Sequence, residues 1–145
     1  MLSDHFSQDE LTASQTATRQ GIKNTPSPAV VENLRMLAAL LEQVRTLLGS
    51  HSIHISSGYR SLALNRYIGS NDTSAHIRGY AADFTCPAFG TPIEVAKKIA
   101  ESNLKFDQLI YEGTWVHISC DPQNRRQLLT ARFKDGHTYY TTGIA

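Results

Sequence analysis

Two short stretches, far apart along the chain, place a strong constraint on how it can fold. Residues 74–83 read Ser-Ala-His-Ile-Arg-Gly-Tyr-Ala-Ala-Asp, and residues 115–119 read Trp-Val-His-Ile-Ser. They supply two imidazoles, from His76 and His117, and one carboxylate, from Asp83. A catalytic zinc site uses such a set, with three protein ligands and a fourth position left for water. If these side chains share a metal, the fold must bring the two stretches side by side.

The spacing of the candidate ligands indicates which elements carry them. His76 and Asp83 are seven residues apart, whereas two ligands on one helix would be three or four apart. Gly79 lies between them and suits a loop that bends before a strand. Residues 81–85 are typical of a short buried strand, and residues 115–119 of a strand rich in β-branched and aromatic side chains. We therefore expect one ligand on a loop and two on strands.

The composition favours one globular domain. The chain has 145 residues, of which 41% are hydrophobic, and a formal net charge of +1. We expect one domain over residues 1–145, with residues 1–26 as an N-terminal extension packed on it. No basic stripe and no apolar run of membrane-spanning length occurs, so we expect no nucleic-acid or membrane partner, and a monomer. The first residues lack the basic segment and apolar core of a signal peptide.

Hydrophobic periodicity predicts an α+β fold, with an antiparallel sheet and helices packed on one side of it. The strongest helix is expected to start at Ser27 and Pro28 and to end at Gly49, with one apolar face. Residues 12–24 are polar and are expected to be irregular. Further helices are expected over residues 8–13, 61–67 and 92–101, and strands over residues 52–57, 81–85, 107–111, 115–119, 127–134 and 137–142.

The pattern S-x-H-x-x-G-x-A-x-D followed by W-x-H resembles that of the zinc D-Ala-D-Ala carboxypeptidases and L-alanyl-D-glutamate endopeptidases that cut bacterial cell-wall peptides. The resemblance covers nearly the whole chain, including residues 56–61 and 106–110. It implies zinc held by His76, Asp83 and His117, and a fold shared with the Hedgehog signalling domain and the lysostaphin-type peptidases. It also implies hydrolysis of peptide bonds in peptidoglycan stem peptides, and leaves open which bond is cut.

Arg60, in the stretch Ser-Gly-Tyr-Arg, is the next candidate. The resemblance implies that this arginine points into the catalytic cleft. A fixed guanidinium there can hold a substrate carbonyl or carboxylate and stabilise the oxyanion of a tetrahedral intermediate. The alternative is an arginine at a helix start that faces solvent.

The general base is the least determined part of the site. Some relatives place an acidic residue three positions before the last histidine, where this chain has Thr114, and others five before, where it has Glu112. A tight turn at residues 113–114 would pair Glu112 with Trp115 and put it on the face of His117. A turn at residues 112–113 would instead place Gln108 opposite His117. We favour Glu112, because a neutral amide cannot accept a proton.

Supporting residues follow from the same pattern. We expect Ser74 to orient the His76 loop, and Trp115 and Gln108 to lie behind the ligands. Asp107 is expected either to support a ligand or to cap a turn. If the ligand strands are antiparallel neighbours, the two cysteines lie beyond disulfide reach. The remaining histidines, at positions 5, 51, 54 and 137, are interpreted as structural or surface residues.

Two other functions are compatible with these residues. The first is a zinc-containing module that binds the cell wall without cleaving it, and the second is a phage structural module in which zinc braces the fold. A cell-wall enzyme without a signal peptide is expected to leave the cytoplasm as phage lysins do, or to have had its signal removed. A base beside the metal distinguishes an enzyme from a binding module, since binding alone does not need one.

Overall fold

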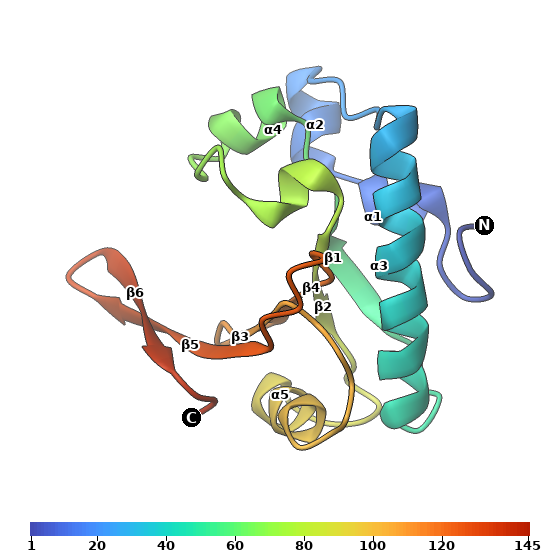
Figure 1. The fold of residues 1–145 in the computed structure, drawn as a ribbon. Helices are drawn as coiled ribbons and strands as arrows, with labels where there is room; N and C mark the ends of the chain where they lie inside the picture. The colour runs from blue at the N-terminus through green and yellow to red at the C-terminus, as the bar shows by residue number, and fades with distance from the viewer.

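A six-stranded sheet forms the centre of the fold in the computed structural model, which describes residues 1–145 (Figure 1). Its strand order is β1-β2-β4-β3-β5-β6, so β1 and β6 are the edge strands. The strands are β1 His54–Ser57, β2 Ala81–Thr85, β3 Gln108–Tyr111, β4 Val116–Ser119, β5 Gln127–Lys134 and β6 His137–Thr142. With its helices, the sheet makes the α+β fold that the sequence predicts.

The register of β2 and β4 brings the two halves of the site together. These strands are antiparallel neighbours, with Asp83 directly opposite His117. The expected arrangement of the ligand strands is therefore confirmed. Cys86 and Cys120, which follow these strands, are both free and buried, as that arrangement predicts.

One pair of strands differs from the expected antiparallel sheet. Strands β3 and β5 are parallel, with Ile110 level with Leu129. After β4 the chain crosses back through residues 120–126 and then runs beside β3 in the same direction. The other four pairs are antiparallel.

Helices α3 (Pro28–Leu47) and α5 (Pro92–Ala100) cover one face of the sheet. Ser27 caps α3 by accepting a hydrogen bond from the backbone N–H of Val30, with Pro28 as its first residue. The apolar stripe of α3 packs with Phe84 and Ile118 of the sheet in the hydrophobic core. Because side chains alternate along a strand, Asp83 and His117 face the opposite side, away from this core.

The N-terminal segment contains a helix that the sequence analysis did not predict. Helix α1 (Gln8–Thr12) lies where a helix was expected, but α2 (Gln15–Gln20) falls in the segment expected to be irregular. The Ser14 hydroxyl accepts from the Ala17 N–H, and Gly21 ends the helix in a left-handed conformation, with φ 65°. Two caps around a six-residue helix compensate for its lack of an apolar stripe.

The remaining helical segments lie on the other side of the site. Helix α4 (Leu62–Tyr67) and the 3-10 helix η1 (Ala75–Arg78) lie across the sheet from α5, and the β5–β6 hairpin projects away from the body (Figure 1). No helix of the fold has both the length and the apolar character needed to cross a bilayer.

Candidate metal centre

His76 lies on a short 3-10 helix rather than on the loop that the spacing predicted. Ser74 caps this helix, and its hydroxyl accepts a hydrogen bond from the His76 N–H at 3.3 Å. Gly79 ends the helix with φ 76°, a conformation that side chains with a Cβ rarely adopt. A Cβ at Gly79 would also lie 2.9 Å from Cγ1 of Val30. The tight turn therefore depends on this glycine and aims His76 at β2.

The three candidate ligands converge on one point. Oδ1 of Asp83 lies 3.0 Å from Nδ1 of His117 and 3.4 Å from Nε2 of His76. One ligand atom from each residue lies within 4.8 Å of the other two. Ligand atoms at ~2.0–2.2 Å from a tetrahedral zinc are about 3.3–3.6 Å apart, so these separations are close to those that a bound ion needs.

A backbone carbonyl selects the nitrogen that His76 offers. Nδ1 of His76 lies 2.7 Å from the carbonyl oxygen of Gly58. When Nδ1–H donates to this carbonyl, Nε2 keeps its lone pair and points at Asp83, as metal-binding histidines commonly do. Gly58 is itself closely packed, because a Cβ there would lie 2.3 Å from the carbonyl oxygen of Leu11. This contact was not predicted from the sequence, although Gly58 belongs to the Ser-Gly-Tyr-Arg stretch.

The charges of the site suit metal binding. Burial opposes ionisation of Asp83, but the two adjacent histidines hold the pKa of its carboxyl well below the usual range. Burial lowers the pKa of His76, which favours the neutral imidazole. A carboxylate and a neutral imidazole are the forms that bind zinc. The donor set therefore fits this metal in chemistry as well as in geometry.

Glu112 shares the cleft with the ligands. The Glu112 N–H donates to the carbonyl oxygen of Trp115 at 3.0 Å, and Gly113 in the turn has φ 85°. The turn is therefore at residues 113–114, and the alternative turn is wrong, since Ile110 rather than Gln108 is opposite His117. Nε1 of Trp115 donates to Oε2 of Glu112 at 2.7 Å.

The surroundings of Glu112 make its carboxylate more basic than an exposed one. Burial raises the pKa of Glu112, and the negative charge of Asp83 raises it further. The hydrogen bond from Trp115 acts in the opposite direction. A carboxylate of raised pKa beside a metal site suits proton transfer near neutral pH.

Arg60 also lines the cleft, and its backbone is fixed by a hydrogen bond. Its backbone N–H donates to the carbonyl oxygen of His76 at 3.1 Å, while its side-chain Nε is buried without a hydrogen-bond partner. Burial lowers the pKa of the guanidinium, although Asp83 and Glu112 act against this shift. An unpaired buried donor is costly unless a ligand satisfies it, so this atom indicates a group yet to be bound.

The cleft has further walls that the sequence analysis did not assign to the site. Tyr140 of β6 lines it, and burial raises the pKa of this phenol, with Glu112 and Asp83 adding to the shift. Arg125 also lines it and holds the buried Asp107 through two hydrogen bonds, at 2.9 and 2.8 Å. Asp107 therefore anchors the segment after β4 rather than a ligand. Gln108, proposed as a supporting residue, lines the cleft and donates to Gln127 at 2.7 Å.

The model of one family, described as peptidase M15, matches residues 4–119. The matched segment includes all three candidate ligands, Arg60 and Glu112, and it ends with β4, so β5 and β6 lie beyond it. No curated protein matches the chain.

Proposed function

Because the chain belongs to the peptidase M15 family, we propose that it is a zinc-dependent peptidase that hydrolyses peptide bonds in peptidoglycan stem peptides. The observation that carries the proposal is the convergence of His76, Asp83 and His117 in one cleft with a carboxylate and a guanidinium. Two imidazoles and one carboxylate are a set used by hydrolytic zinc sites, which keep a position open for water and substrate. When bound, zinc supplies Lewis-acid polarisation of the scissile carbonyl and lowers the pKa of water.

Glu112 is proposed as the general base and later the general acid. Its Oε2 is fixed by Trp115, and Oε1 has no hydrogen-bond partner in the structure. The free oxygen can take a proton from the attacking water and deliver it to the leaving amine. Its raised pKa helps it to hold that proton between the two steps.

Arg60 is proposed to stabilise the negative charge that develops on the scissile carbonyl oxygen. The positive charge of the guanidinium is preorganised for two reasons. The backbone N–H of Arg60 donates a hydrogen bond to the carbonyl oxygen of His76, and the side-chain Nε is already buried away from solvent. Preorganised donors of this kind supply electrostatic stabilisation without reorganisation during the reaction. The guanidinium would therefore interact more strongly with the charged oxygen of the tetrahedral intermediate than with the neutral carbonyl of the substrate.

The experiment that tests this function is the replacement Glu112→Gln. We expect the variant to keep its zinc and its fold and to cleave purified stem peptides ~10²–10⁴-fold more slowly, because general-base catalysis is lost. Mass spectrometry of the digests measures the rate and identifies the bond that is cut. Glu101→Gln, an exposed glutamate at the end of α5, is the matched control and should retain full activity.

Two results would contradict the proposal. Near-normal turnover by Glu112→Gln would show that another group is the base. A parent protein that binds zinc and cell wall but cleaves no stem peptide would show a binding module instead.

A further inference from the structure

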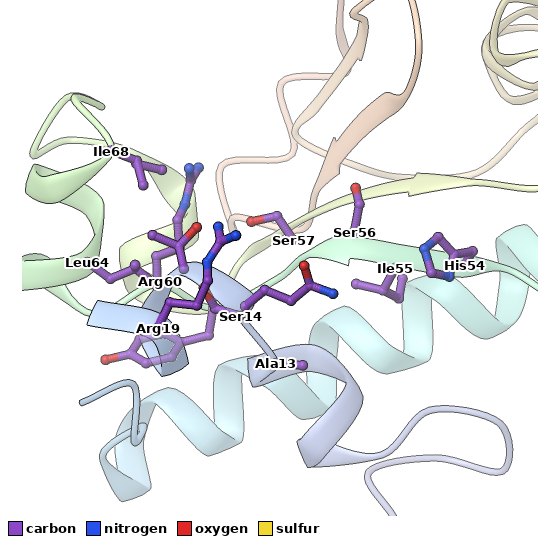
Figure 2. Close-up of a pocket in the computed structure, with 13 residues that line it drawn as sticks. Ala13, Ser14, Arg19, His54, Ile55, Ser56, Ser57, Arg60, Leu64 and Ile68 are labelled. Carbon is purple, nitrogen blue, oxygen red and sulfur yellow. The ribbon is translucent and has the colours of Figure 1, made fainter. Parts of the chain in front are cut away.

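A second pocket, which also has Arg60 in its lining, lies beside the N-terminal segment that carries Ser14 and Arg19 (Figure 2). We call it the Arg19 groove. Arg19 and Arg60 lie toward one end of it, His54 and Ile55 toward the other, and Ser57 between them (Figure 2). Its lining includes Ser14 and Arg19 from the N-terminal segment, and Ile55, Ser57 and Arg60 from β1 and the residues after it. The groove therefore runs between the N-terminal segment around α2 and the edge strand β1.

The Arg19 groove adjoins the catalytic cleft. Arg60 lines both of them. Ser57, which lines the groove, is paired with Asp83 across β1 and β2. A peptide whose scissile bond lies at the metal could therefore extend past Arg60 into this groove.

The charge of the groove selects for an anion. Its lining contains two arginines and no aspartate or glutamate. Arg19 is exposed and takes part in none of the ion pairs or side-chain hydrogen bonds of the structure. A guanidinium with free N–H donors is suited to bind a carboxylate through two parallel hydrogen bonds.

The edge of β1 offers a second kind of contact. Strand β1 pairs only with β2, and no backbone hydrogen bond joins residues 54–57 to any other segment. The N–H and C=O groups on its outer side therefore remain available along the groove. Exposed edges of this kind bind extended peptide segments through the main chain.

We infer that the Arg19 groove binds the part of the substrate peptide next to the cleaved bond, and that Arg19 binds a free carboxylate of that peptide. The inference rests on the proposed function, because it names the substrate feature that the same site recognises. A glutamate that is linked through one carboxyl group keeps its other carboxyl free, so a stem peptide with such a glutamate would supply the anion. Arg19 is thus a specificity residue, whereas Arg60 acts at the reacting bond.

Binding to the zinc-loaded Glu112→Gln protein tests the inference without interference from turnover. The probes are two fluorescently labelled stem peptides, one with the glutamate carboxylate free and one with it converted to the amide. We expect the carboxylate form to bind about 10-fold to 100-fold more tightly, the size of one hydrogen-bonded charge contact. Adding Arg19→Ala should abolish this preference, and Arg19→Lys should restore part of it.

Arg35→Ala provides the matched control. Arg35 is an exposed arginine on α3, paired with Glu32 at 3.4 Å, and it does not line the groove. Its removal should leave both affinities unchanged, which excludes an effect of net charge alone. Circular dichroism of each variant checks that the fold is intact.

The outcomes separate this inference from the proposed function. The inference is overturned if adding Arg19→Ala leaves the full preference for the carboxylate peptide. It is also overturned if the two peptides bind equally well to the Glu112→Gln protein. Cleavage of stem peptides by the parent protein would then still support the peptidase. If the parent cleaves no stem peptide but Arg19-dependent binding persists, the groove stands as a peptide site and the proposed function fails.

Discussion

At the scale of single residues, the site depends on groups that fix the ligands rather than on the ligands alone. The carbonyl of Gly58 accepts from Nδ1 of His76, and Nε1 of Trp115 donates to Glu112. Each contact leaves one defined atom free, Nε2 of the histidine and Oε1 of the glutamate. Such outer contacts can change metal affinity or activity by 10–100-fold when they are lost.

Replacing Trp115 with phenylalanine tests the second of these contacts through a pH profile. The hydrogen bond stabilises the carboxylate of Glu112 and opposes the rise in pKa that burial causes. Without it, the pKa of Glu112 should rise further, so the base should be protonated at a higher pH than in the parent. We therefore expect the acidic limb of the kcat/KM profile to move to higher pH, measured by stem-peptide hydrolysis.

Tyr139→Phe is the control for this change, because Tyr139 is an exposed aromatic residue of β6 outside the cleft. Its profile should coincide with that of the parent. An acidic limb that stays in place or moves to lower pH in Trp115→Phe would show that the titrating group is not Glu112.

At the scale of elements, some helices, turns and strand pairings could be predicted from local sequence patterns and others could not. The β3–β4 hairpin could be predicted, because Gly113 in a two-residue turn determines the pairing of Glu112 with Trp115. Helix α2 could not be recognised from hydrophobic periodicity, since its six residues have no apolar stripe and depend on caps at Ser14 and Gly21. The parallel pairing of β3 and β5 has no local sequence signal, because it depends on how residues 120–126 bring the chain back beside β3.

The connection from β4 to β5 depends on an ion pair that can be tested. Asp107 is buried, with 3% of its side chain exposed, and it accepts from the side chain of Arg125 at 2.9 and 2.8 Å and from its backbone N–H at 3.1 Å. Asp107→Asn should lower the free energy of unfolding at pH 7 by about 1–3 kcal/mol, because it removes charge-assisted hydrogen bonds from a buried group. Chemical denaturation measures the change.

The difference in unfolding free energy between the parent and Asp107→Asn should depend on pH, and the direction of the shift in the pKa of Asp107 shows how. Hydrogen bonds from Arg125 hold the pKa of Asp107 below its ordinary value in the folded state. The stabilisation is therefore present above the unfolded-state pKa of ~3.9 and is lost as the pH falls through the lower folded-state pKa. The parent and Asp107→Asn should thus converge in stability in strong acid.

Asp72→Asn is the matched control for this ion pair. Asp72 and Arg66 are also 2.8 Å apart, but 52% of the Asp72 side chain is exposed. Exposed pairs contribute little, so this variant should unfold much as the parent does. If the two substitutions lowered the free energy of unfolding equally, burial would not explain why the Asp107 ion pair is the more stabilising one.

At the scale of the whole molecule, the site is built from several segments. Some of its residues could be predicted from the sequence and others could not. The three candidate ligands could be predicted from their types and spacing, since few residue types bind zinc, and the observed register pairs Asp83 with His117. Tyr140 could not be predicted, because β6 reaches the cleft only through the parallel placement of β5. Arg19 could not be predicted either, because it enters the groove on a helix that periodicity does not reveal.

The same assembly predicts that metal binding stabilises the entire fold. The candidate ligands lie on η1, β2 and β4, so an ion bound to them would join segments that are separate in the sequence. Zinc at about 100 times its dissociation constant should add ~2.7 kcal/mol to the free energy of unfolding. For a domain of this size the melting temperature should rise by about 5–10 °C over the chelated protein, as measured by calorimetry. Because metal binding requires deprotonated ligands, the rise should shrink as the pH falls.

Two variants determine whether this stabilisation comes from the proposed centre. His76→Ala removes a ligand, so its melting temperature should no longer respond to zinc. His51→Ala removes an exposed histidine outside the site and should respond as the parent does. A parent protein whose melting temperature is the same with zinc and with chelator at pH 7.5 would contradict the metal centre. An equal zinc response in His76→Ala and the parent would place the ion elsewhere, because a site that loses one of three ligands cannot keep its full affinity.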